Sequence, residues 1–127
     1  MIERTEAITS GMLKLALDAT SLNHQAIANN IANVGSHGYR PARVNFEQQL
    51  GSIQQTLAQG GRVKASMLDG ILPVLELLPG TVDGDRTASL DMETARLAEN
   101  TVHYEALLKA TGMRMSMLNA AINEGKR

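Results

Sequence analysis

The chain has 127 residues, enough for one domain or for two long elements joined by a structured loop. Hydrophobic residues make up 43% and aromatic residues only 2%, so aliphatic side chains must form any core, which favours helix packing. The net charge of −1 gives no electrostatic reason to expect nucleic-acid binding, and the absence of cysteine excludes thiol catalysis, disulfides and thiolate-ligated metals.

The first predicted element is a long helix over residues 6–34. Its apolar and small residues follow alternating steps of four and three, the heptad pattern of a helix that packs along one seam. This seam comprises Ile8, Met12, Leu15, Ala19, Leu22, Ala26, Asn29 and Asn33. A second stripe, about 100° further round the axis, comprises Leu13, Leu17, Thr20, His24, Ile27, Ile31 and Val34. Two stripes indicate contact with more than one neighbour.

Asparagines are concentrated at the end of this helix, in the run A-N-N-I-A-N of residues 28–33. Asparagine is a poor helix former, yet Asn29 and Asn33 fall on the seam. One explanation is a fraying helix end, where asparagine caps well. The explanation that we favour is that the buried amides of Asn29 and Asn33 fix register and partner choice, while the small Ala28 and Ala32 admit another backbone.

Residues 35–88 differ in character, because they hold most of the glycines and all three prolines. Helical spacing predicts a short helix over residues 46–59, through Phe46, Leu50, Ile53 and Leu57. Residues 62–68 and 71–78 are typical of two extended pieces around a central Asp-Gly turn, a possible β-hairpin. Pro73 would confine the second strand to an edge.

The last predicted element is a helix over residues 89–123, with Ser89 as its N-cap. Its four-three series runs through Leu90, Thr94, Leu97, Thr101, Tyr104, Leu108, Thr111, Met115, Leu118 and Ile122. We expect a mainly α fold of one domain, residues 1–127, in which the two terminal helices pair along their cleanest seams as an antiparallel, coiled-coil-like hairpin. The second stripe of the first helix would then remain exposed for neighbours.

No motif carries catalytic chemistry. His24, His37 and His103 lie on different predicted elements and lack metal-binding spacing. The run D-G-D of residues 83–85 matches only part of a calcium loop and is better explained as a turn before the last helix. Phosphate-binding and nucleophile motifs are absent from the sequence. We therefore expect no enzyme activity, no cofactor, no metal site, no nucleic acid and no small-molecule substrate.

The A-N-N-I-A-N run of residues 28–33, followed by G-Y-R at 38–40, resembles the helix end and turn of flagellar rod, hook and related axial proteins. Ser36 and His37 stand where that family usually carries threonine and proline. Residues 97–104, L-A-E-N-T-V-H-Y, resemble the L-A-E-N-x-x-x-Y pattern of one proximal rod subunit of the family. The resemblance involves both predicted terminal helices.

The resemblance implies a structural subunit of the proximal rod in the periplasmic part of the flagellar basal body. Its partners would be other rod subunits, the inner-membrane ring and the export gate, in a homo- and hetero-oligomeric helical assembly. No basic segment followed by an apolar run opens the chain, so we expect no cleaved signal peptide, in agreement with the type III export of family members. The alternatives are another axial subunit, a soluble helical-hairpin adaptor and, least favoured, a small enzyme.

The expected assembly interface lies on the terminal helices and on the turn after the first of them. It comprises Leu22, Ala26, Ala28, Asn29, Asn30, Ile31, Ala32, Asn33, Gly38, Tyr39, Leu97, Asn100, Tyr104, Leu108, Met115 and Leu118. Among these residues, we expect Gly38 to supply a left-handed or close-approach backbone position and Tyr39 to act as an anchor with an apolar body and a polar tip.

Overall fold

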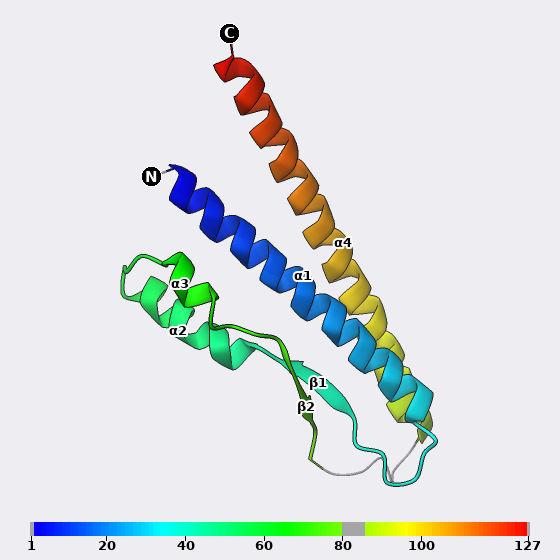
Figure 1. Cartoon of the computed structure of the whole chain (residues 1–127). Coiled ribbons are helices and arrows are strands. Elements are labelled where there is room, and N and C mark those ends of the chain that lie inside the picture. Colours follow the sequence, from blue (N-terminus) through cyan, green and yellow to red (C-terminus); the bar gives the residue numbers. More distant parts are fainter. Residues whose placement is uncertain (1, 80–85, 127) are drawn as a thin grey trace.

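The structure is a computed structural model that describes residues 2–79 and 86–126. It is mainly helical: α1 spans Ile2–Asn33 and α4 spans Arg86–Gly125. The two helices run antiparallel, so that both ends of the chain lie at the same end of the hairpin (Figure 1). The predicted fold class is confirmed. Ser89 lies inside α4 and is not its N-cap, since the helix begins three residues earlier.

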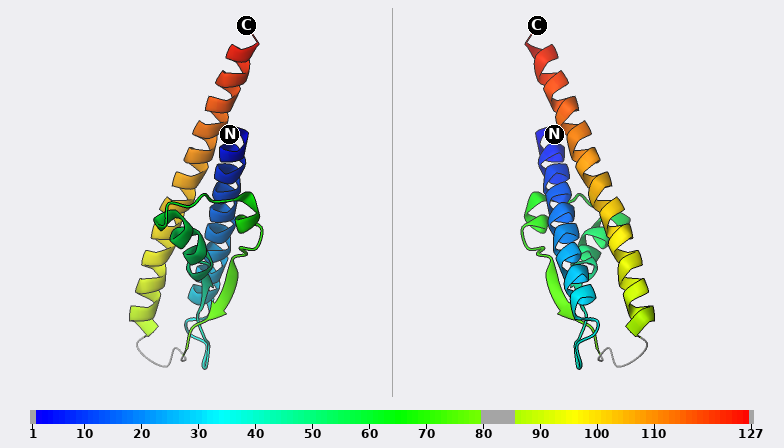
Figure 2. Two further views of the ribbon diagram at one scale, coloured as in Figure 1. Left: turned by 90° about the vertical axis from the view of Figure 1, so that its left-hand side faces the viewer. Right: turned by 90° about the vertical axis from the view of Figure 1, so that its right-hand side faces the viewer.

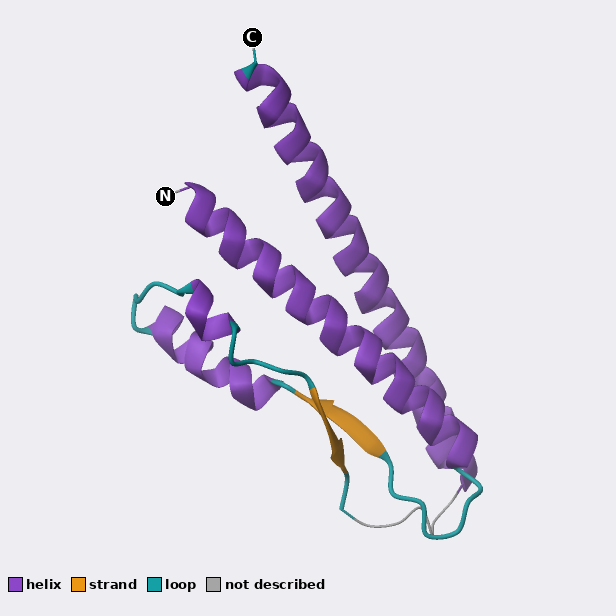
Figure 3. Ribbon diagram, in the orientation of Figure 1, coloured by secondary structure: helices purple, strands orange, loops and turns teal. Residues whose placement is uncertain are grey.

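Between the long helices, the described residues form four short elements, which Figure 3 separates by type. They are β1 (Ala42–Asn45), α2 (Glu47–Ala58), α3 (Ala65–Leu68) and β2 (Val74–Leu77). The short helix predicted over residues 46–59 is confirmed by α2. The two strands form an antiparallel sheet in which Ala42 lies opposite Leu77.

The predicted β-hairpin is wrong in its first strand, although its second strand contains β2. Residues 65–68 form α3, and β1 supplies the partner strand instead. A two-residue type I′ hairpin turn needs positive φ at both central residues. Asp69 has φ −63°, and positive φ among the described glycines occurs only at Gly38 and Gly60. The Asp-Gly pair therefore closes a helical turn rather than a hairpin.

A small apolar core lies on the side of α1 away from α4. Ile53, Leu68 and Ile71 are buried in it, and Ile8 and Leu15 of α1 pack against them. The helices of the middle segment, α2 and α3, lie beside α1 on the side away from α4 in the view of Figure 1, and Figure 2 shows the same elements from two further sides. Ile8 and Leu15 of the predicted α1 seam thus pack on the core of the middle segment.

Candidate assembly interface

Polar side chains at one heptad position of α4 join the two long helices. Asn30 donates from Nδ2 to Glu93 Oε2 at 3.1 Å, and Asn23 donates from Nδ2 to Asn100 Oδ1 at 3.0 Å. A step of seven residues along α4 is therefore matched by a step of seven in the opposite direction along α1. This is the spacing of an antiparallel pair that keeps one face toward its partner.

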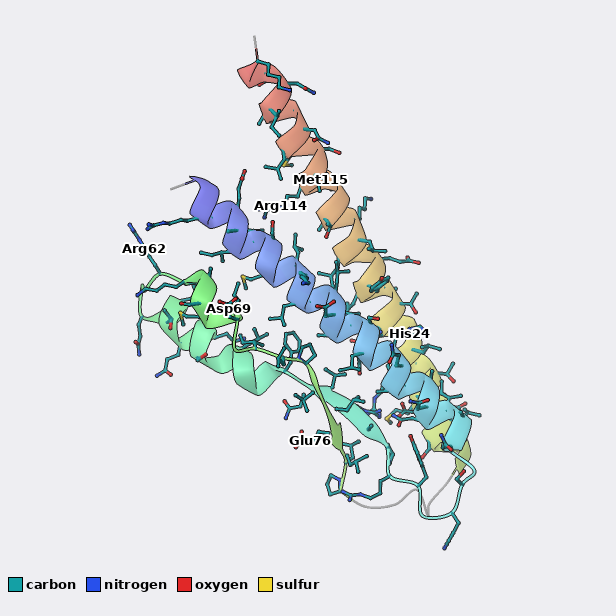
Figure 4. The ribbon with its side chains drawn as sticks, viewed as in Figure 1. His24, Arg62, Asp69, Glu76, Arg114 and Met115 are labelled. Carbon is teal, nitrogen blue, oxygen red and sulfur yellow. The ribbon has the colours of Figure 1, made fainter. Side chains whose placement is uncertain are left out.

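The same register continues toward the chain ends. Asn100 donates from Nδ2 to the carbonyl of Thr20 at 3.0 Å, and the guanidinium of Arg114 donates to the carbonyl of Glu6. The step of fourteen residues from Asn100 to Arg114 on α4 is again matched by a step of fourteen from Thr20 to Glu6 on α1. Arg114 lies on the side of α4 toward the first turns of α1, one position before Met115 (Figure 4). Hydrogen bonds therefore fix the register of the hairpin over most of its length.

Much of the predicted apolar seam of α4 stays exposed, although Leu97, Thr111 and Leu118 are half-buried. The exposed fraction is 38% for Tyr104, 48% for Leu108, 57% for Met115 and 55% for Ile122. The prediction that pairing buries the cleanest seam of each helix is therefore wrong for these four positions of α4. The residues that face α1 precede that seam by one position, because the buried amide and carboxylate groups of Asn100 and Glu93 find their hydrogen-bond partners there.

The buried asparagine at the end of α1 is Asn30, which is 2% exposed. Asn29 is exposed, and Asn33 donates from Nδ2 to the carbonyl of Asn29 at 2.8 Å in an exposed bond. The prediction of buried amides at Asn29 and Asn33 is therefore wrong. Asn30 lies about 100° from Asn29 around the axis, and this is the direction of β1 and α4.

Asn30 closes the outer edge of β1. The amide of Leu78 donates to the carbonyl of Pro41 at 2.8 Å, and the alternation of an antiparallel ladder then directs the N–H and C=O of Ala42 away from β2. Asn30 Oδ1 accepts from Ala42 N at 2.9 Å, and Asn30 Nδ2 donates to Ala42 O at 3.0 Å. At Ala42, one side-chain amide therefore takes the place of a third strand.

Glu93 joins α4 to α1 and β1 through its buried carboxylate, and the residue is 6% exposed. Arg43 forms a two-pronged ion pair with it, in which Nη1 lies 3.1 Å from Oε2 and Nη2 also contacts Oε1. Arg96 adds a bond from Nη1 to Oε1 at 2.9 Å. Removing one partner of such a buried pair typically costs about 3–5 kcal/mol.

Tyr39 completes the network from the turn after α1. Its hydroxyl donates to Asn30 Oδ1 at 2.9 Å, which gives the predicted polar tip a partner within the chain. Burial raises the pKa of Tyr39 above 10.0, the Glu93 charge adds to the increase, and Arg43 opposes it. Gly38 precedes Tyr39 with φ +70°, so the predicted left-handed glycine is also confirmed.

The structure divides the sixteen predicted interface residues by exposure. Those buried are Ala26, Asn30 and Asn100; those half-buried are Leu22, Ile31, Asn33, Tyr39, Leu97 and Leu118. The exposed ones, which remain the predicted contact surface for a neighbour, are Ala28, Asn29, Ala32, Gly38, Tyr104, Leu108 and Met115. The residues that the sequence reasoning missed are polar, namely Asn23, Arg43, Glu93, Arg96 and Arg114. The seven-residue spacing of Glu93 and Asn100 was the available signal.

Within residues 2–79 and 86–126, no three histidine, aspartate or glutamate side chains gather as a metal site would require. The Asp83–Asp85 run lies outside the described residues. None of the described helices combines the length and the hydropathy of a membrane span.

Comparison with known proteins gives one informative similarity. No protein-family model matches the chain. The chain is 23% identical over 125 residues to the flagellar basal body rod protein FlgB of Bacillus subtilis (strain 168). The alignment covers 90% of this chain and 92% of that protein. A similarity that includes both terminal helices and the middle segment supports the predicted relationship to flagellar rod proteins.

Proposed function

We propose that this protein is a structural subunit of the bacterial flagellar rod, of the FlgB type, which assembles with other axial subunits through its terminal helices. The observation that carries the proposal is the similarity to FlgB along 90% of the chain. In the proposed role the protein performs no catalysis and needs no cofactor. It lies in the proximal rod in the periplasm, near the inner-membrane ring and the export gate, and leaves the cytoplasm by type III export.

The exposed stripe on α4 supports assembly through this helix. Leu108, Met115 and Ile122 repeat at seven-residue intervals, and each is about half exposed, at 48–57%. Fully burying a large aliphatic side chain contributes about 1.5–3 kcal/mol. Since polar bonds already hold α4 to α1, this apolar face is left for a helix of a neighbouring subunit.

The end of α4 gives the same indication. Arg114 lies opposite Glu6, and Figure 1 shows the last turns of α4 extending past the start of α1. Ile122, on these last turns, is 55% exposed. A helix that extends beyond its partner with apolar residues exposed can pack on a second subunit without disturbing the hairpin.

The proposal is tested by tagging the chain in cells that make it and purifying their basal bodies. We expect the tagged chain in the basal-body fraction, crosslinked to rod subunits. Recovery only in the soluble fraction would favour the adaptor alternative. A crosslinking pattern in which the chain contacts neither the inner-membrane ring nor the export gate would favour another axial subunit.

The α4 stripe is tested by Leu108→Asp, with Val102→Asp as the matched control. Val102 is 63% exposed and lies off the stripe, so both substitutions place a charge on the surface of the same helix. We expect Leu108→Asp to lower incorporation into basal bodies at least tenfold while far-ultraviolet circular dichroism stays unchanged. Equal incorporation of the two variants would show that this stripe is not the assembly face.

A further inference from the structure

The outer edge of β2 has no strand partner among the described residues. Because Leu78 bonds to Pro41, the ladder alternation directs the backbone N–H and C=O of Leu75 and Leu77 away from β1. Both side chains are also exposed, at 46% and 55%. A short apolar strand with outward backbone groups is a template for pairing with a second copy of the chain.

Two prolines flank this edge at the next outward-facing positions of the chain. Continuing the alternation past Leu75 and Leu77 puts the next outward positions at 73 and 79, and these are Pro73 and Pro79. Proline has no backbone N–H to donate to an added strand. An incoming strand therefore finds two outward N–H donors, with a proline on each side of them.

In three antiparallel registers, an outward leucine of β2 lies opposite an outward leucine of a second copy. Centring the pair on Leu75 places Leu77 opposite Pro73 of the copy, and centring it on Leu77 places Leu75 opposite Pro79. Each of these registers loses two hydrogen bonds, one at the proline of each copy. The remaining register, centred on Glu76, sets two carboxylates directly opposite each other, which is destabilising. Each register therefore meets a specific obstacle.

Glu76 is held in position for this role. Its Oε2 accepts from Asn45 Nδ2 across the sheet at 2.6 Å, and Figure 4 shows the residue on β2. On the opposite edge of the sheet, the Asn30 amide already occupies the outward groups of Ala42. A side-chain amide thus occupies one outward position of β1, while prolines and a charge flank the outer edge of β2.

We propose that Pro73, Glu76 and Pro79 prevent copies of this chain from pairing edge to edge through β2. The chain contains no cysteine, so a single introduced cysteine reports pairing at a chosen position. Residues opposite each other in a hydrogen-bonded antiparallel pair have Cα atoms about 5.5 Å apart, within the range that a disulfide spans. Leu75→Cys therefore reports the register centred on that residue.

The experiment compares Leu75→Cys with the double variant Pro73→Val/Leu75→Cys in the full chain, under mild oxidation at equal concentration. We expect at least tenfold more covalent dimer from the double variant, because the valine restores the missing donors. Pro73→Val/Val74→Cys is the matched control and should stay at background, since position 74 does not lie opposite itself in this register. Far-ultraviolet circular dichroism verifies that each variant keeps its helices.

Leu77→Cys with and without Pro79→Val repeats the test at the other proline and decides it if the first pair of variants does not fold. Equal dimer from the single and double variants, whether high or at background, would overturn the proposal. The readout lies on β2 and needs no flagellar assembly, so it is independent of the test at Leu108.

Discussion

Replacing Asn30 by alanine is expected to destabilise the folded chain strongly, whereas Asn29→Ala is not. The two residues are neighbours in the same last turns of α1, but Asn30 is 2% exposed and Asn29 is exposed. The Asn30 amide makes four hydrogen bonds: two with the backbone of Ala42, one with the Tyr39 hydroxyl and one with Glu93. Asn29→Ala therefore controls for the change in helix propensity.

The magnitude follows from these bonds. Each bond to a neutral group contributes about 0.5–1.5 kcal/mol net, and the bond to the ionised Glu93 about 1.5–3 kcal/mol. The Ala42 carbonyl keeps a second donor, Arg43 Nη1 at 3.0 Å, so part of the loss is offset. We expect Asn30→Ala to lower the free energy of unfolding by about 3–5 kcal/mol, against a gain of up to about 0.5 kcal/mol for Asn29→Ala.

The assay is urea unfolding of the full chain, followed by far-ultraviolet circular dichroism, with amide hydrogen exchange at Ala42 as the local readout. Ala42 donates to Asn30 Oδ1, so Asn30→Ala should accelerate exchange of this amide at least tenfold more than Asn29→Ala does. Asn30→Asp keeps an acceptor but loses the donor and sets a second charge beside Glu93, so we expect it to be no less destabilising at neutral pH. A difference below about 0.5 kcal/mol between Asn30→Ala and Asn29→Ala would refute this account of the network.

Three further predictions concern single positions. In the Tyr104→Phe variant, Tyr39 is the one remaining tyrosine, so absorbance titration follows Tyr39 alone. We expect the pKa of Tyr39 to lie above 10.0 because burial disfavours the phenolate. Since the pKa is raised in the folded state, the contribution of protonated Tyr39 to stability is complete below about pH 10 and decreases as the pH rises further. A midpoint at or below 10.0 would contradict the buried position of the hydroxyl. Gly38→Ala should cost about 1–2 kcal/mol because φ is +70°, whereas Gly35→Ala, with no neighbouring atom within 4 Å of its added Cβ and no positive φ, should be nearly neutral in the same unfolding assay. Leu97→Asp should lower the free energy of unfolding by about 1–3 kcal/mol, since the side chain is half-buried, and unchanged stability would argue against its place in the hairpin.

Local periodicity predicted α1 and α4 well, because an amphipathic helix repeats its pattern over many turns. Helix α2 and the strand β2, within the predicted segment 71–78, were found from short-range spacing alone. Strand β1 was missed because it has only four residues, all half-buried, without a clear alternation. The outward backbone groups of Ala42 on this strand bond to Asn30, twelve positions earlier. A local sequence pattern does not predict such a non-local bond.

The orientation of α4 was mispredicted for a more general reason. An apolar four-three series identifies a face that packs, but it does not say whether the partner is in the same chain. Glu93 and Asn100, seven residues apart, lie one position before that series, and matching groups on α1 and β1 satisfy them. The residues that fix the register of the hairpin and the residues of the apolar contact surface therefore lie on adjacent faces of α4. It follows that substitutions on the two faces should separate: loss of Asn100 should loosen the hairpin, while Leu108→Asp should leave it folded.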